Sequence, residues 1–274
     1  MKVTATVITF NEAAHIGAAL ASLSFADEII VVDSESTDDT VAIARRHTDQ
    51  VIVRPWPGYV AQKNFAAEQA SHDWILSLDA DERVSDSLRE EIRGLMQGEP
   101  TKGSPPQEKG PPAGYRIPRV TFHLGRWIRS TDWYPDYQLR LYDRRRARWA
   151  GRHVHESVAV DGPVEYLRGE LQHYAYRDLA HHHQAMDRYT TLAAREMHED
   201  GRRAGWFHVF VHARLAFFRN YILRGGFRDG MPGLIVSSMN AHYVALKFAK
   251  LWELCSPSTS IPPAPGAGDS NKSS

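Results

Sequence analysis

The stretch Val3–Leu23, VTATVITFNEAAHIGAALASL, changes from an apolar, β-branched run to a run of strong helix formers. The same alternation continues as far as residue 78. The apolar runs lie at 3–10, 28–33, 50–55 and 74–78, and a helical segment separates each from the next. Short strands that alternate with helices indicate a parallel sheet with helices on both faces. The sequence therefore predicts an α/β fold with a Rossmann-like sheet.

Acidic and hydroxyl side chains dominate the loops that follow these strands. In open parallel sheets, ligands bind where the loops at the carboxyl ends of the strands converge. Here those loops are Thr9–Glu12 (TFNE), Asp33–Thr40 (DSESTDDT), Arg54–Gly58 (RPWPG) and Asp79–Glu82 (DADE). Neither a dinucleotide fingerprint nor a P-loop is present. We therefore expect a divalent cation, held by the crowded carboxylates of DADE, to handle phosphate; a solvated acidic turn is the alternative.

Composition sets further bounds. With 33 basic and 33 acidic residues in a chain of 274, the overall charge favours no nucleic acid partner. The single cysteine, Cys255, can form no disulfide within the chain, which fits a reducing cytoplasm. There is no apolar stretch of about 18 residues, as a membrane-spanning helix requires. The first residues show no secretion signal, so we expect a cytoplasmic protein.

Three motifs in order carry a resemblance to a known family. They are T-x-N-E at Thr9–Glu12, D-S-x-S-T-D at Asp33–Asp38 and D-x-D at Asp79–Asp81, and together they resemble the family 2 glycosyltransferases of the GT-A fold. Residues 134–145, 151–158 and 221–234 further resemble the bacterial lipopolysaccharide core β-1,4-glucosyltransferase-like subgroup. The resemblance covers about residues 1–254, apart from an insertion near 97–113.

The resemblance implies a site for a UDP-sugar donor. The implied donor-binding side chains lie at the strand ends and on the helix after the third strand: Thr9, Asn11, Glu12, Asp33, Lys63, Asn64 and Asp79. Thr9 and Glu12 would border the base and ribose, Asp33 would accept a hydrogen bond from the uracil imide, and Asp79 would contact the ribose. Asn11 could instead only cap a helix, and Lys63 could instead lie on a solvated helical face.

The resemblance also implies that Asp81 ligates Mg²⁺ or Mn²⁺ between the two phosphates of the donor. His173 could complete the metal shell, although a lone histidine can equally serve a structural role. The histidines at 181–183 are excluded, because successive residues of a helix point about 100° apart and cannot all chelate one ion.

An inverting transfer requires a base that takes the proton from the attacking hydroxyl group. Glu156 is the first candidate and Asp136 the second. For both carboxylates, a structural salt bridge to one of the arginines between 140 and 152 is the alternative.

The C-terminal part of the chain combines aromatic and cationic residues. Residues 202–250 contain eight arginines and lysines but a single acidic residue, Asp229. Aromatic residues recur in the same range at about helical spacing. Such amphipathic helices suit the headgroup region of an anionic inner leaflet, which would make attachment to the membrane peripheral. An ordinary helix docked on the α/β domain is the alternative.

These observations predict five regions. They are a nucleotide-sugar half (1–96), a flexible insertion (97–114), an acceptor half (115–200), a helical region (201–254) and a disordered tail (255–274). The function that the resemblance implies is metal-dependent, inverting transfer of a hexose, glucose from UDP-glucose, to lipopolysaccharide inner core. A polyprenyl-linked, capsular or peptide acceptor, and a nonenzymatic nucleotide- or membrane-binding scaffold, are the alternatives.

Overall fold

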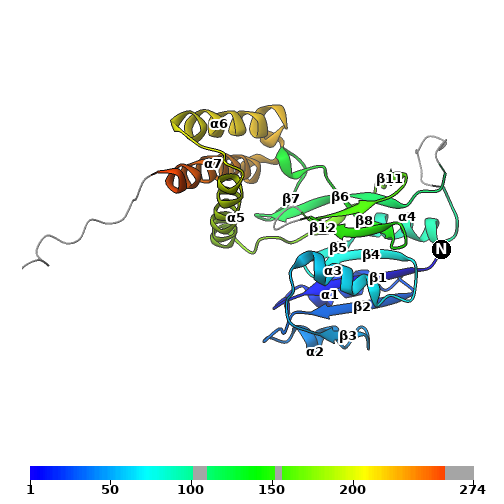
Figure 1. Ribbon diagram of the computed structural model, residues 1–274. Coiled ribbons are helices and arrows are strands. Elements are labelled where there is room, and N and C mark those ends of the chain that lie inside the picture. The colour runs from blue at the N-terminus through cyan, green and yellow to red at the C-terminus, as the bar shows by residue number, and fades with distance from the viewer. Residues whose placement is uncertain (101–109, 152–155, 257–274) are drawn as a thin grey trace, which may run out of the picture.

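The computed structural model describes residues 1–100, 110–151 and 156–256 (Figure 1). The first part contains β1 (Val3–Thr9), α1 (Ile16–Ser22), β2 (Glu28–Asp33), α2 (Thr40–Ala44), β3 (Val51–Val53), α3 (Tyr59–Glu68), β4 (Trp74–Asp79), β5 (Glu82–Val84) and α4 (Asp86–Met96). Next come β6 (Gly114–His123), β7 (Arg126–Ile128), η1 (Thr131–Trp133), β8 (Asp136–Asp143), β9 (Ala147–Ala150), β10 (Ser157–Val160), β11 (Val164–Tyr166) and β12 (Leu171–His173). The C-terminal part contains α5 (Leu179–Glu199), α6 (Trp206–Phe218), η2 (Arg219–Leu223), η3 (Gly226–Asp229) and α7 (Gly230–Cys255).

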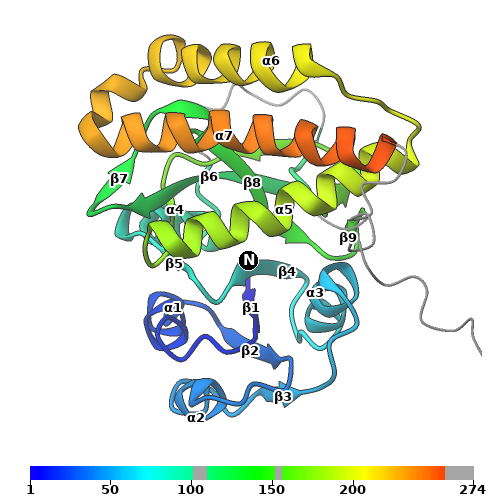
Figure 2. The same cartoon turned by 90° about the vertical axis from the view of Figure 1, so that its left-hand side faces the viewer.

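The first four strands form the predicted parallel sheet. Their order is β3-β2-β1-β4, and all three neighbouring pairs are parallel. Every residue of the central strand β1 is buried, as expected for a strand covered on both faces. One hydrophobic core unites this sheet with α1, α2 and α4, and a second core lies under α3. Figure 2 shows α1 and α2 on one side of β1–β3 and α3 on the other.

The second half of the sheet brings distant segments to the same edge. β8 runs antiparallel to β4, with Trp74 opposite Asp143, so that β8 begins where β4 ends. β6 lies next to β8, and β12 lies between β6 and β5. The register places His173 beside Glu82 on β5 and Thr121 on β6. Residues from four separate stretches of sequence therefore meet at the carboxyl end of β4.

The helices α5, α6 and α7 pack together beyond this edge (Figure 1). They are joined to the sheet through the turn after β7, where Asp132 accepts hydrogen bonds from the side chains of Asn220 (3.0 Å) and Asn240 (3.2 Å). Arg219 and Arg224 form ion pairs with the same carboxylate. The loop that leads into β8 is thus fixed to the C-terminal helices.

Residues 201–254, which the sequence predicts to be helical, contain α6, η2, η3 and most of α7. In the predicted insertion, residues 101–109 lie outside the described residues, and β6 already begins at Gly114. The predicted disordered tail falls mostly on residues 257–274, which also lie outside the described part, while Cys255 still belongs to α7. Within the described ranges, no helix is both long and apolar enough to span a bilayer.

Candidate active site

The loops after β1 and β2 are bound to each other. Asn11 has a left-handed backbone (φ 53°), and its Oδ1 accepts a hydrogen bond from the Thr37 amide at 2.8 Å. The Asn11 amide donates to Ser36 Oγ at 2.8 Å, and the Glu12 amide donates to Thr40 Oγ1 at 2.7 Å. Because α1 begins only at Ile16, the interpretation of Asn11 as a helix cap is wrong. Asn11 instead braces the two loops.

Thr9 and Asp33 lie side by side at the ends of β1 and β2. Asp33 is fully buried, and its carboxylate accepts hydrogen bonds from the Ser36 amide (2.8 Å) and hydroxyl (2.5 Å). Thr9 Oγ1 is buried and has no hydrogen-bond partner among the described residues. A buried hydroxyl without a partner is costly unless a ligand satisfies it. Their contact with a base or ribose stays a prediction.

The crowded carboxylates at the end of β4 are neutralised mainly from within the protein. Asp79 pairs with Lys63 at 3.0 Å and with Arg140 at 2.7 Å. Glu82 is fully buried and pairs with Arg140 (2.8 Å) and Arg119 (3.2 Å). Burial alone would raise the pKa of Asp79, but Arg140 and Lys63 outweigh this effect and lower it. The acidic stretch is therefore not a freely solvated turn, and its role as a cation site stays a prediction.

Lys63 and Asn64 belong to the wall behind this network. Lys63 is only 3% exposed, so its interpretation as part of a solvated face is wrong. Its ammonium group lies 4.2 Å from the centre of the Trp149 ring. The Asn64 amide group both donates to and accepts from the main chain of Trp149, at 3.0 and 2.9 Å. Asn64 therefore fixes β9 to α3, and its predicted nucleotide contact stays a prediction.

Asp81 differs from its neighbours because its ion-pair partner is a histidine. Its carboxylate lies 3.3 Å from His173 Nε2, and 26% of its side chain is exposed. Burial would raise the pKa of Asp81, but His173 lowers it. No group of three or more potential ligands occurs within the described part of the chain. Asp81 and His173 fit a cation that takes its remaining ligands from a bound substrate, as a nucleotide diphosphate would provide.

Glu12 and His15 extend the site toward α1. Burial raises the pKa of Glu12 to about 7, and the nearby negative charges of Asp81 and Asp38 add to this effect. Burial also lowers the pKa of His15. Near neutral pH, Glu12 is thus poised to exchange a proton beside Asp81.

The two candidate bases lie in different surroundings. Asp136 accepts hydrogen bonds from Arg119 (Nε 3.0 Å, Nη2 2.6 Å) and Gln138 (2.7 Å), and its side chain is 32% exposed. Asp136 thus forms a salt bridge, but with Arg119 and not with one of the arginines between 140 and 152, and its role as a base stays a prediction. Glu156 has a buried Oε2 without a partner among the described residues, and His155 lies outside that part of the chain.

The histidines at 181–183 lie on α5 and point in different directions, as expected. His182 packs between Tyr176 and His123, while His183 stacks on His242. Burial lowers the pKa of His182 to about 4, which keeps it neutral.

Arg119 and Arg140, which pair with the carboxylates of the site, are not among the site residues that the sequence predicts. One signal was available, because Asp136, Gln138 and Arg140 alternate along β8 and so share a face. Arg119 could not be placed without the register of β6 against β8, which sets it opposite Asp136.

The model of the family "Glycosyl transferase family 2" matches residues 4–158, more than half of the chain. The chain belongs to glycosyl transferase family 2, and it is a glycosyltransferase. It is 31% identical over 262 residues to the lipopolysaccharide core biosynthesis glycosyltransferase LpsC of Rhizobium meliloti, covering 92% of this chain and 93% of the relative. An uncharacterized glycosyltransferase of Rickettsia felis is 33% identical over 264 residues, covering 92% and 90%.

The structural comparison agrees with the predicted GT-A fold. The mannosyltransferase PcManGT from Pyrobaculum calidifontis, solved in complex with GDP-Man and Mn²⁺, superposes with a TM-score of 0.51 at 17% identity. The match covers 92% of this chain and 87% of that protein. Because it covers 92% of this chain, the match extends beyond the parallel strands to the second half of the sheet and the C-terminal helices.

Replacing Arg140 tests the internal neutralisation. Arg140→Met leaves Asp79 and Glu82 with less positive charge in a buried setting, so we expect the free energy of unfolding to fall by about 3 kcal/mol. Arg148→Met is the matched control, because Arg148 lies exposed on β9, and its effect should stay within about 0.5 kcal/mol. Urea unfolding followed by circular dichroism measures both, and equal stabilities would contradict the assigned role of Arg140.

Proposed function

We propose that this glycosyltransferase moves a hexose, glucose from UDP-glucose, to lipopolysaccharide inner core with inversion at the anomeric carbon. The observation that carries the proposal is the position of Asp81. It is partly exposed and, among the described residues, forms an ion pair with His173 alone, at the edge where Thr9 and Asp33 also end their strands. The lipopolysaccharide core activity in the name of LpsC, similar over nearly the whole chain, supports the acceptor.

In this proposal, Thr9, Glu12, Asp33 and Asp79 border the nucleoside of the donor. The free hydroxyl of Thr9 is available to a ligand. Lys63 acts from behind Asp79, where it holds the carboxylate in place.

Asp81 and His173 would hold Mg²⁺ or Mn²⁺, while the bracing of Asn11 fixes the loops around them. When bound, the cation supplies Lewis-acid stabilisation of the negative charge on the departing diphosphate. The protein's own contribution is to keep this corner fixed before the donor arrives.

Glu156 is the proposed base, because its Oε2 has no partner among the described residues and can accept the proton of the acceptor hydroxyl. Asp136 is the second candidate, since it is partly exposed and its strand begins at the end of β4. Arg119 donates two hydrogen bonds to Asp136 Oδ2, which orient this carboxylate.

A pair of isosteric variants separates the candidates. With UDP-glucose and a core oligosaccharide, we expect Glu156→Gln to lower kcat for UDP release by about a hundredfold or more and to leave UDP affinity unchanged. Asp161→Asn, an exposed change in the turn after β10, is the control. If Asp136→Asn alone shows the loss, the base is Asp136. If the wild type forms no glucosylated product, the proposed transfer is wrong.

We further propose peripheral attachment to the anionic inner leaflet, on the cytoplasmic side. The helical segment from α6 to the start of α7 exposes large apolar side chains: Trp206, Phe207, Phe210, Leu215, Phe218, Ile222, Leu223, Phe227 and Met231. The same segment carries Arg214, which forms no ion pair with a described carboxylate. Arg219 and Arg224, in contrast, both form ion pairs with Asp132. An apolar face with a cationic rim suits a lipid headgroup layer.

Vesicle binding tests this attachment. The double variant Trp206→Ser, Leu223→Ser removes two side chains that are 74% and 70% exposed, so folding should be preserved. We expect the affinity of this variant for vesicles of anionic phospholipid, measured by co-sedimentation, to be at least about tenfold lower than that of the wild type. Tyr166→Ser, an exposed aromatic residue on β11, should change nothing. Full binding by the double variant would favour a helix that merely docks on the domain.

A further inference from the structure

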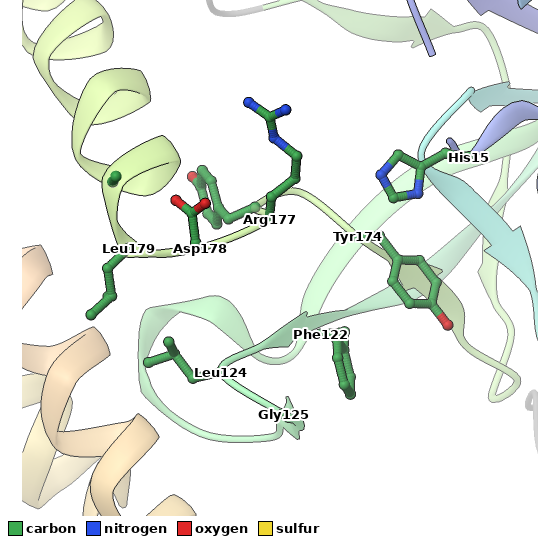
Figure 3. Close-up of a pocket in the computed structure, with 10 residues that line it drawn as sticks. His15, Phe122, Leu124, Gly125, Tyr174, Arg177, Asp178 and Leu179 are labelled. Carbon is green, nitrogen blue, oxygen red and sulfur yellow. The ribbon is translucent and has the colours of Figure 1, made fainter. Parts of the chain in front are cut away.

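A cavity of about 640 Å³ opens between the start of α1, the β6–β7 turn and the segment that joins β12 to α5 (Figure 3). Figure 3 shows His15 and Arg177 along one side of the opening, and Phe122 with the turn at Leu124 and Gly125 along the other. The described side chains that line it include none of those assigned to the donor or to the base. The cavity is therefore a distinct part of the site.

One wall of the cavity is aromatic. Tyr174 and Phe122 line it, with ring centres 5.8 Å apart, and Trp127 packs edge-on against both at 5.2 and 5.4 Å. The electron-rich face of an aromatic ring attracts the C–H groups that a sugar ring presents. This wall is thus suited to a pyranose.

Nitrogen groups that form no ion pair among the described residues line this cavity or lie behind its aromatic wall. The Arg83 guanidinium lies 4.0 Å from the centre of the Tyr174 ring, and its Nε is buried without a hydrogen-bond partner. His15 Nδ1 is also buried without a partner. Arg177 lines the cavity, and no carboxylate of the described residues pairs with its guanidinium or with that of Arg83. By contrast, Arg119 and Arg140 are each paired with two carboxylates.

The carboxylate in the lining does not neutralise these groups. Asp178 accepts a hydrogen bond from the His181 amide at 2.7 Å and so caps α5. Guanidinium groups left unpaired beside an aromatic wall provide charge-assisted hydrogen bonds to an oxyanion. The chemistry of the cavity therefore combines a surface for a sugar with a site for an anion.

We propose that this cavity binds the acceptor sugar through an anionic substituent, a phosphate or a carboxylate, held by Arg177, the guanidinium group that lines it. The inference rests on the proposed transfer to a glycan acceptor. The cavity is close to the proposed metal ligand, because the amide of Tyr174, which lines the cavity, donates a hydrogen bond to the carbonyl oxygen of Asp81 at 3.0 Å. An anchored acceptor would present a neighbouring hydroxyl group toward the donor bound at Asp81.

Binding of simple sugars to the full chain tests the proposal without turnover. Calorimetry is performed with mannose 6-phosphate, glucuronate and methyl glucoside. We expect at least one anionic sugar to bind the wild type about tenfold or more tightly than methyl glucoside. Preference for the sugar phosphate identifies a phosphate as the substituent, and preference for glucuronate identifies a carboxylate. Absence of any preference would overturn the proposal.

Three variants complete the test. Arg177→Gln should abolish the preference, and Arg177→Lys should retain part of it, because a single positive charge remains. Arg195→Gln, an exposed change on α5, should retain it fully. UDP affinity with Mn²⁺ should be equal in all of them. A preference that survives Arg177→Gln, or a loss of UDP affinity in that variant, would contradict an acceptor role. Failed transfer with intact anion binding would contradict only the proposed function.

Discussion

The ion pairs of Arg140 with Asp79 and Glu82 are the interaction on which the site depends. Three acidic residues within four positions repel one another, and a buried carboxylate without a counter-charge would be strongly destabilising. Arg140, assisted by Lys63 and Arg119, supplies the counter-charge from β8, α3 and β6. This neutralisation leaves Asp81 as the carboxylate of the cluster that pairs with neither a lysine nor an arginine among the described residues.

The same network joins the two halves of the molecule. Arg119 links Glu82 to Asp136, and the loop before Asp136 is held by the C-terminal helices through Asp132. The donor corner, a candidate base and the helices proposed to meet the membrane therefore form one continuous set of polar contacts.

Strand-end motifs were sufficient to predict the parallel sheet and the family, because the spacing of apolar residues and the position of loops are local properties of a sequence. The pairing of charges was not predictable, since it depends on the antiparallel register of β6, β8 and β12. From the sequence alone, Lys63 could equally lie on the solvated face of its helix. In the structure it is buried, because its ammonium group contacts Asp79 and the ring of Trp149. The cavity at Arg177 joins residues more than 150 positions apart, and no local pattern marks it.

We propose that Asp81, rather than its neighbours Asp79 and Glu82, which are neutralised by ion pairs, holds the divalent cation together with a nucleotide diphosphate. Titration of Mn²⁺ in the presence of UDP, followed by electron paramagnetic resonance, tests it most directly. The account predicts that Asp81→Asn weakens Mn²⁺ binding at least about tenfold, because a neutral amide is a poorer ligand for a hard cation, while Asp136→Asn binds like the wild type. Wild-type affinity in Asp81→Asn would contradict it.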